Sequence, residues 1–319
     1  MPLQSVLFMT TVDTRVFKTG SALDFVHFSG VEARPRLPRP RHTPELHTPV
    51  AHTADLPRTS AAPAPLDPFA AWLLTHAGLH ANAYRSAPLN RRLPAVLRRL
   101  RMHSPEAARK LLRTNPELLP AALDALLIGV SSFFRDTKVF DYMRESGLRS
   151  LLQSRRGVSV ISAGVSNGCE LYSIAILLAE AGVLGHSSLL GIDCRSDAIK
   201  QARQGRFQES ELSEVEQCLR GRYFRLEGTR YQAGSFLRHA IQWGCADLMT
   251  YIPPAFDLIL FRNVAIYLED GFAAPVWDRL CSALTPGGFL LTGKAEKPPA
   301  GLPLQCVSPS VYRKKDVAS

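Results

Sequence analysis

Ser162-Ala163-Gly164-Val165-Ser166-Asn167-Gly168-Cys169-Glu170 is the stretch of this chain that indicates its fold. It begins at the end of a short apolar run, residues 158–163, and leads into a predicted helix, residues 171–181. A strand, a glycine-containing loop and a helix N-terminus form the nucleotide-binding corner of many α/β domains, because glycine lets the backbone approach a ligand closely. Taken alone, the stretch is also compatible with an ordinary strand-to-helix connection.

The pattern of strand and helix recurs through the second half of the chain. Four short apolar runs are separated by segments of helical length: residues 158–163, 189–192, 256–261 and 289–292. This alternation predicts a parallel sheet covered by helices on both faces, as in a Rossmann-like domain. Aromatic and β-branched residues between Tyr223 and Trp243 predict a small antiparallel insertion. We predict this α/β domain over residues 129–319, with the β insertion at about 207–243.

The first part of the chain has a different composition. Residues 1–67 are predicted to be a disordered or unassigned tail, because most of this stretch is rich in Pro, Arg and His and lacks an apolar period. Residues 68–128 are predicted to form a small all-helical domain. Its best-marked helix has Leu93, Val96, Leu97 and Leu100 on one face, and Ser104 followed by Pro105 is typical of a helix start.

Composition limits the classes of protein that fit. No apolar run approaches the roughly 20 residues of a membrane span, and the N-terminus lacks a signal-peptide pattern, so we expect a cytoplasmic protein without a transmembrane segment. The six cysteines form no CxxC pair, so neither a metal site nor a disulfide framework is predicted. The net charge of +10 favours an acidic partner, which could be nucleic acid, an anionic membrane or a glutamate-rich protein.

Two acids and the glycine spacing indicate the ligand of the loop. Asp193 ends the second apolar run, where a carboxylate can accept hydrogen bonds from both ribose hydroxyls of an adenosyl ligand. Gly164 and Gly168 are not spaced as in the GxGxxG loop that holds a pyrophosphate. Glu170, close to the same loop, suits a cationic amino group such as that of methionine better than a phosphate.

Four blocks of sequence carry a resemblance to a known family: residues 131–136 (SSFFRD), 162–173, 261–267 (FRNVAIY) and 287–290 (GGFL). In this order and spacing they resemble the CheR-type chemotaxis-receptor glutamate methyltransferases, over about residues 69–315. In that family a helical domain precedes a Rossmann-like methyltransferase domain with a small antiparallel β-subdomain. The resemblance therefore implies the same organisation as the hydrophobic pattern predicts.

The resemblance also implies a cofactor, a substrate and a set of site residues. The cofactor would be S-adenosyl-L-methionine, and the substrate a methyl-accepting chemotaxis receptor or a similar Glu-rich helical protein. The implied cofactor-binding residues are Ser131, Arg135, Glu170, Asp193, Asp247, Leu248, Arg262 and Asn263. Arg135 and Tyr267 would lie nearest the transferred methyl group and act in catalysis.

Some positions depart from the family's usual pattern. Ser131 stands where Thr is usual, Asp247 where Asn is usual, and Cys169-Glu170-Leu171 where Glu-Glu-Pro is usual. Glu170 thus keeps the second acid of the pair. The predicted insertion lacks the glycine-rich loop with which some members hold a receptor's C-terminal pentapeptide, so that tether is not predicted.

A cluster of arginines could serve the partner. Five of them lie in or beside the helix that begins near Leu93: Arg91, Arg92, Arg98, Arg99 and Arg101. A charge run of this kind is usually a solvated helix face, but it also suits docking to the acidic helices of a receptor.

Two other functions are compatible with parts of the sequence. A nucleic-acid methyltransferase is suggested by the charge and by Tyr251-Ile252-Pro253-Pro254, although the residues around the two prolines differ from the motif that holds a flipped base. A non-catalytic signalling module that binds S-adenosylmethionine is the other alternative, because a fold does not guarantee activity.

Overall fold

A computed structural model describes residues 64–127, 131–250 and 255–316 of the chain. Residues 60–319 form one compact unit. Most of the predicted tail, and the Tyr251–Pro254 motif, lie outside the described residues. Within the described residues no helix has both the length and the apolar character needed to cross a membrane.

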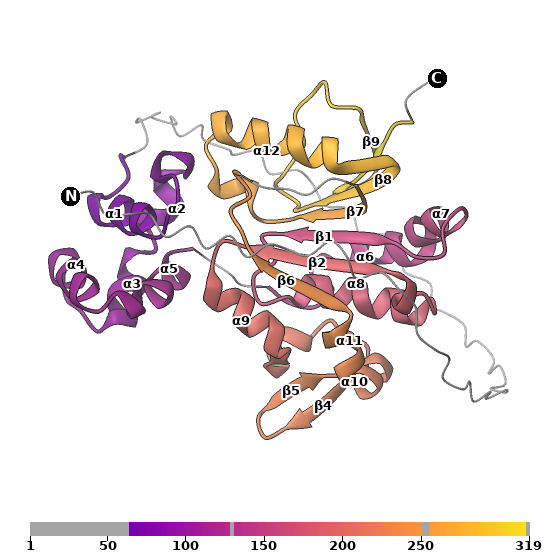
Figure 1. Ribbon diagram of the computed structural model, residues 1–319, viewed down its shortest axis with the longest axis horizontal. Helices are drawn as coiled ribbons and strands as arrows, with labels where there is room; N and C mark the ends of the chain where they lie inside the picture. Colours follow the sequence, from indigo (N-terminus) through magenta and orange to yellow (C-terminus); the bar gives the residue numbers. More distant parts are fainter. Residues whose placement is uncertain (1–63, 128–130, 251–254, 317–319) are drawn as a thin grey trace, which may run out of the picture. The chain divides into compact units, whose positions relative to one another are not determined.

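A seven-stranded sheet forms the centre of the α/β region, with the strand order β6-β2-β1-β7-β8-β10-β9 (Figure 1). Its strands are β1 (Ser159–Ala163), β2 (Ser188–Asp193), β6 (Ile241–Cys245), β7 (Phe256–Phe261), β8 (Leu284–Thr292), β9 (Leu304–Ser308) and β10 (Val311–Lys314). The first five strands in this order pair in parallel, whereas β10 and β9 add an antiparallel edge. The four predicted strands are β1, β2, β7 and β8, and they pair in parallel as predicted, whereas the antiparallel edge formed by β10 and β9 was not predicted.

The side chains of β7 show why this sheet is covered on both faces. All six residues of the strand are buried, which is typical of a parallel strand between two helical layers. Leu258 and Leu260 belong to the hydrophobic core on one face, which also contains the helix after the glycine loop. Ile259 and Phe261 face the opposite core, where Trp277 of α12 packs edge-on against Phe261.

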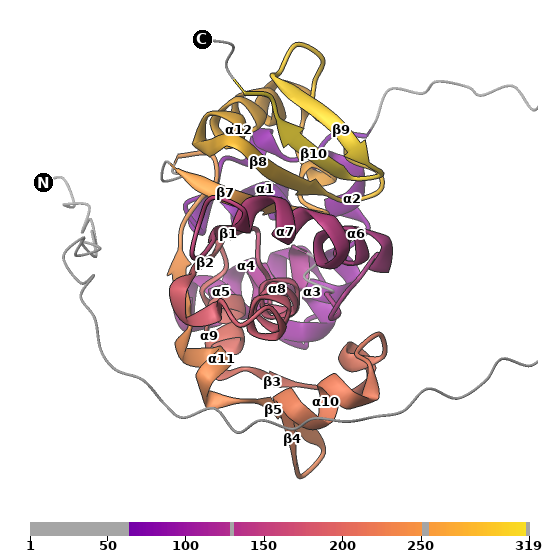
Figure 2. The same ribbon diagram turned by 90° about the vertical axis from the view of Figure 1, so that its right-hand side faces the viewer.

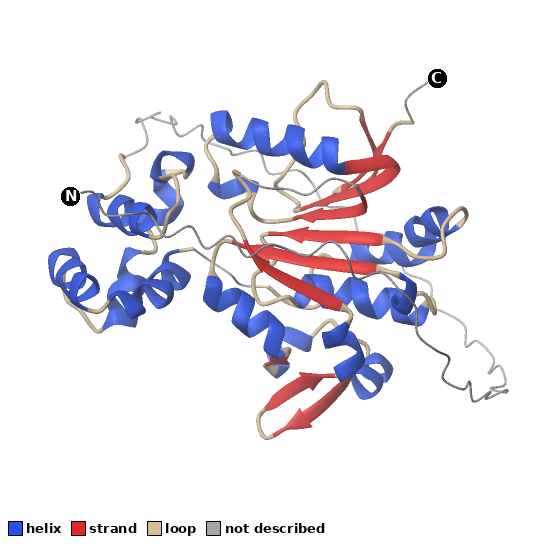
Figure 3. Cartoon of the chain, in the orientation of Figure 1, coloured by secondary structure: helices blue, strands red, loops and turns tan. Residues whose placement is uncertain are grey.

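Helices cover these faces as Figures 2 and 3 show. The helices of the α/β region are α6 (Thr137–Tyr142), α7 (Leu148–Leu152), α8 (Cys169–Glu180), α9 (Ser196–Gln204) and α12 (Asp270–Ala283). A short π-helical segment, Met143–Gly147, joins α6 to α7, and 3-10 turns lie at Leu184–His186 and Ala265–Tyr267. The predicted helix after the glycine loop is α8, and it begins two residues earlier than expected.

The insertion is antiparallel, as predicted, but it ends earlier. It consists of β3 (Arg206–Phe207), β4 (Phe224–Glu227) and β5 (Arg230–Ala233), with α10 (Gln217–Tyr223), α11 (Ser235–His239) and a 3-10 turn at Glu209–Leu212. Trp243 lies in β6, which pairs with β2 of the central sheet. The predicted limit at residue 243 is therefore wrong, because an edge strand of the main sheet has the same aromatic and β-branched composition as an insertion strand.

The N-terminal helices α1–α5 have a hydrophobic core of their own. They are α1 (Pro68–His76), α2 (Ser86–Asn90), α3 (Leu93–Leu100), α4 (Pro105–Thr114) and α5 (Leu119–Leu126), with 3-10 turns at Ala81–Ala83 and Pro116–Leu118. The predicted apolar face of α3 is oriented inward, with Val96 and Leu100 buried. Ser104 caps α4 by accepting a hydrogen bond of 3.2 Å from Ala107 N.

Candidate functional site

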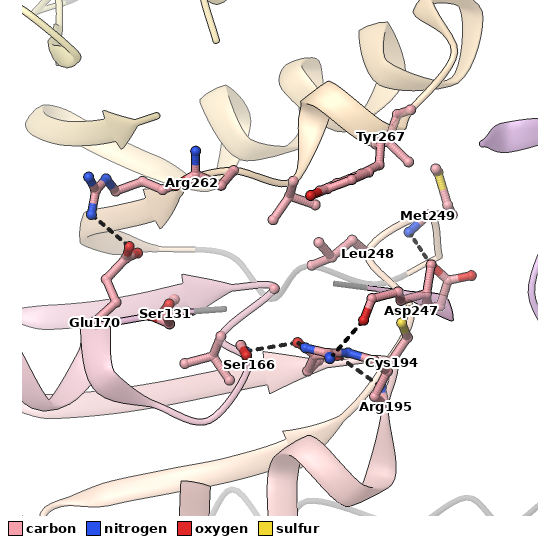
Figure 4. Close-up of a pocket in the computed structure, with 18 of the residues that line it drawn as sticks. Ser131, Ser166, Glu170, Cys194, Arg195, Asp247, Leu248, Met249, Arg262 and Tyr267 are labelled. Carbon is pink, nitrogen blue, oxygen red and sulfur yellow. Dashed lines mark hydrogen bonds and ion pairs between the residues drawn. The ribbon is translucent and has the colours of Figure 1, made fainter. Parts of the chain in front are cut away.

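A cavity of about 960 Å³, including the space at its mouth, lies at the ends of the parallel strands (Figure 4). The connections that follow β1, β2, β6 and β7 supply most of its walls. The carboxyl ends of parallel strands are the usual place for a ligand in an α/β sheet, because the connections there are free to surround it. The N-terminal helices contribute Tyr84 and Leu127 to the same cavity.

The glycine loop is shaped by close backbone contacts. Gly164 N and Val165 N donate hydrogen bonds of 2.8 and 2.9 Å to Ile192 O at the end of β2. Gly164 has φ = +79°, and a Cβ atom there would lie 2.5 Å from Val264 Cγ2. Only glycine fits both requirements, so Gly164 lets the loop bend back over the strand ends and present Ser166 to the cavity.

Asp193 lies at the end of β2 and is 4% exposed. Its Oδ2 accepts a hydrogen bond of 2.9 Å from Ser166 N in the glycine loop. Its Oδ1 accepts from Arg195 N at 2.9 Å, and the Arg195 guanidinium donates to both carboxylate oxygens. The loop after β1 and the turn after β2 therefore meet at this one carboxylate.

Glu170 and Arg262 form the opposite side of the cavity (Figure 4). Arg262 Nη1 donates to Glu170 Oε2 at 2.8 Å, and Arg262 Nη2 donates to Asp136 Oδ2 at 2.8 Å and to the backbone carbonyl of Arg135. Burial raises the pKa of Glu170 above its ordinary value, although the Arg262 charge acts in the opposite direction. Arg262 thus holds the glycine-loop helix and the segment around Arg135 together.

The loop after β7 depends on a buried acid that the sequence analysis missed. Glu296 Oε2 accepts from Asn263 N at 2.6 Å and from Gly293 N at 2.8 Å, while Oε1 accepts from Val264 N at 2.7 Å. Asn263 has a left-handed backbone, with φ = +59°. The carboxylate offsets the cost of this conformation and fixes the loop that leads to Tyr267.

The N-terminal helices hold the far end of that loop. Arg85 N donates to Tyr267 O at 2.8 Å, and Glu269 N donates to Ala83 O at 2.9 Å, which forms a two-residue antiparallel bridge. Between them, Tyr84 enters the cavity wall, and burial raises the pKa of its phenol well above the ordinary value. No sequence motif indicates this contact, because it joins segments more than 180 residues apart.

The structure brings all nine predicted site residues to one cavity: Ser131, Arg135, Glu170, Asp193, Asp247, Leu248, Arg262, Asn263 and Tyr267. Their individual roles stay predictions. The prediction missed several other lining residues, of which Tyr84, Ser162, Ser166, Cys194 and Arg195 carry polar side chains. Cys194 and Arg195 directly follow Asp193, so the end of the second apolar run was a usable signal for both.

The fold and the site define an α/β domain that binds an adenosyl cofactor in the manner of S-adenosylmethionine-dependent methyltransferases. The glycine loop, the acid at the end of β2 and the acid at the start of α8 all line the cavity at the carboxyl ends of the parallel strands. Residues 129–306 match the model of the CheR methyltransferase SAM-binding domain. This chain belongs to the CheR methyltransferase family, as the sequence blocks predicted.

Similar proteins are chemotaxis protein methyltransferases. That of Listeria innocua is 29% identical over 222 residues, which cover 69% of this chain and 85% of the relative. That of Vibrio parahaemolyticus is 30% identical over 191 residues, covering 57% of this chain and 70% of the relative. A probable chemotaxis protein methyltransferase of Rhizobium etli is 31% identical over 187 residues, covering 55% and 70%.

Proposed function

We propose that this protein transfers the methyl group of S-adenosylmethionine to glutamate side chains of a chemotaxis receptor. The observation that carries the proposal is the convergence on one cavity, at the strand ends, of the nine residues that the sequence resemblance implied. Membership of the CheR family and similarity to chemotaxis protein methyltransferases support the same reaction. A protein that acts on the signalling part of a receptor would work in the cytoplasm.

The side chains around the cavity suit the charges of S-adenosylmethionine. Asp193 would accept hydrogen bonds from the ribose, and Asp247 and Leu248, which line the same cavity, would lie beside the adenine. Glu170 would hold the cationic amino group, and Arg262 keeps Glu170 in place. Ser131 and Asn263 complete the wall around the methionine part.

Arg135 and Tyr267 are the proposed residues beside the transferred methyl group. A glutamate carboxylate, with a pKa near about 4.3, is ionised at neutral pH and needs no general base. Its oxygen forms a bond to the methyl carbon while the carbon–sulfur bond breaks and its electron pair stays on sulfur. The protein supplies orientation and exclusion of water, for which the planar guanidinium of Arg135 is well suited.

The proposed receptor contact is the cationic face of α3, which comprises Arg91, Arg98, Arg99 and Arg101. All four of these side chains are exposed. Arg92 differs, because it is partly buried and donates a hydrogen bond of 3.2 Å to Ala125 O of α5. We therefore assign docking to the other four arginines and a structural contact to Arg92.

Transfer of a tritiated methyl group to a receptor's cytoplasmic fragment tests the proposal. The expected product releases labelled methanol on mild base treatment, as a carboxyl methyl ester does. A fragment in which Gln replaces the acceptor glutamates should take up no label. Tyr267→Phe removes the phenol hydroxyl but keeps the aromatic ring. The same transfer assay on this variant tests whether the hydroxyl takes part in methyl transfer.

Two results would contradict this function. Label that resists base and is removed by nuclease would identify nucleic acid as the acceptor. Tight binding of S-adenosylmethionine without transfer to any receptor fragment would identify a non-catalytic signalling module.

A further inference from the structure

The carboxylate of Asp193 has no acceptor position to spare in this structure. A carboxylate offers about four lone-pair positions, and Asp193 receives four hydrogen bonds. Two come from the backbone, from Ser166 N at 2.9 Å and Arg195 N at 2.9 Å. Two come from the Arg195 side chain, from Nε to Oδ1 at 3.0 Å and from Nη2 to Oδ2 at 3.2 Å.

A ribose that binds to Asp193 must therefore replace existing hydrogen bonds. The two backbone donors are fixed by the glycine loop and by the turn after β2, so they cannot leave without a change of fold. The two guanidinium bonds can be exchanged by rotation of one side chain. Arg195 is the group that the ribose hydroxyls would displace.

A second carboxylate, that of Asp124, lies within reach of the displaced Arg195 guanidinium. Arg195 Nη1 already donates to Asp124 Oδ1 at 2.9 Å and to Leu127 O at 3.2 Å, both at the end of α5. The side chain of Arg195 is 7% exposed, so losing Asp193 without another carboxylate would leave a buried charge uncompensated. Asp124, whose side chain is 38% exposed, can take the full ion pair.

We propose that Arg195 is a positioning residue that competes with the cofactor ribose for Asp193 and shifts toward Asp124 when the ribose binds. This inference rests on the proposed function, because it takes S-adenosylmethionine as the ligand. It assigns to the N-terminal helices a part in setting cofactor affinity. Asp124 draws the arginine away, and Asp193 then becomes available.

The competition requires two substitutions in one ion-pair network to have opposite effects. Arg195→Met removes the competitor, so the affinity for S-adenosylmethionine should rise about five-fold or more. Asp124→Asn weakens the alternative partner, so Arg195 stays on Asp193 and the affinity should fall about three-fold or more. A purely structural network would lose affinity with both substitutions.

Titration calorimetry of the full chain with S-adenosylmethionine measures these effects. The double variant Arg195→Met with Asp124→Asn should bind as Arg195→Met does, because Asp124 acts only through the arginine. Arg195→Lys keeps the charge but not the planar guanidinium, so its affinity for S-adenosylmethionine should lie between those of the wild type and Arg195→Met. This variant also tests the competition if Arg195→Met does not fold. Arg206→Met breaks an exposed ion pair with Glu227 and serves as the matched control without effect.

Weaker or unchanged binding by a folded Arg195→Met variant would overturn the competition, as would tighter or unchanged binding by Asp124→Asn. An additive double variant would also overturn it. Failure of the wild-type chain to bind S-adenosylmethionine would instead contradict the proposed function, so the two failures are distinguishable.

Discussion

Arginines occupy two contrasting regions of this molecule, the walls of the cofactor cavity and the cationic face of α3. Arg195 and Arg262 in the cavity wall are 7% and 1% exposed in their side chains, and each pairs with two carboxylates. The arginines of the α3 face are exposed. Buried pairs are screened little by salt, whereas exposed charges are screened within about 8 to 10 Å at physiological ionic strength. Arginine therefore forms buried ion pairs with the acids of the cavity wall in one region, and can attract an acidic partner from the surface in the other.

Replacing Arg262 should have the largest effect. Arg262→Met leaves Glu170 without its cation, while Asp136 keeps its ion pair with Lys294; removing one partner of a buried pair costs about 3 to 5 kcal/mol. For a unit of this size we expect a loss of about 6 to 15 °C in melting temperature, measured by calorimetry. Arg313→Met, at a more exposed site on β10, is the control. A shift equal to that of the control would show that the buried pairs do not fix the cavity.

The ribose contact gives the next largest effect. Asp193→Ala removes the proposed acceptor and should weaken S-adenosylmethionine binding by about ten-fold or more, since hydrogen bonds to a charged group contribute about 1.5 to 3 kcal/mol. Calorimetric titration measures this change. Asp197→Ala, which breaks only an exposed pair with Lys200, should not alter the affinity. Unchanged affinity of a folded Asp193→Ala chain would refute the ribose assignment.

Glu170 should make cofactor binding depend on pH. Its ionised form attracts the cofactor's amino group, so affinity should fall as pH falls through its pKa. Because burial raises that pKa, the fall should begin at a higher pH than for an ordinary carboxylate. Glu170→Gln should bind about three-fold or more weakly near neutral pH and lose this pH dependence. A Glu170→Gln chain with the wild-type pH profile would exclude this role.

The α3 face should have the smallest effect, and only toward the receptor. Changing Arg91, Arg98 and Arg99 together to Glu should raise the KM for the receptor about three- to ten-fold, because exposed charges at the lower end of their usual range contribute about 0.2 to 0.5 kcal/mol each. The affinity for S-adenosylmethionine should stay unchanged. Added salt should slow the wild-type reaction and reduce the difference between the two chains. Equal KM values at low salt would place receptor docking elsewhere.

The sequence predicted those parts of the fold that depend on local patterns. The apolar face of α3 and the fully apolar run of β7 are both visible in the order of residues, because each is set by burial along one element. The strands β9 and β10 were missed. β10 contains Arg313 and Lys314, so its composition resembles a polar loop, and only its pairing with β8 makes it a strand.

The same distinction applies to the cavity. Motif residues such as Glu170 and Asp193 were predicted because they lie beside the elements that position them. Glu296 and Tyr84 were not, because their roles depend on contacts with segments distant in sequence. Even for Asp193, the sequence did not show that Arg195 already uses both carboxylate oxygens.

The bridge between Ala83–Arg85 and the Tyr267 loop determines which part of the chain a shortened protein would need to keep. The family model begins at residue 129, and a protein cut there would keep the glycine loop and Asp193. It would lose the wall that Tyr84 provides and the backbone bond from Arg85 that holds Tyr267 O. Such a fragment could still recognise the adenosyl part while leaving the methyl group exposed to water. For protein engineering, we therefore expect the smallest catalytic unit to include the N-terminal helices, although the glycine loop lies outside them.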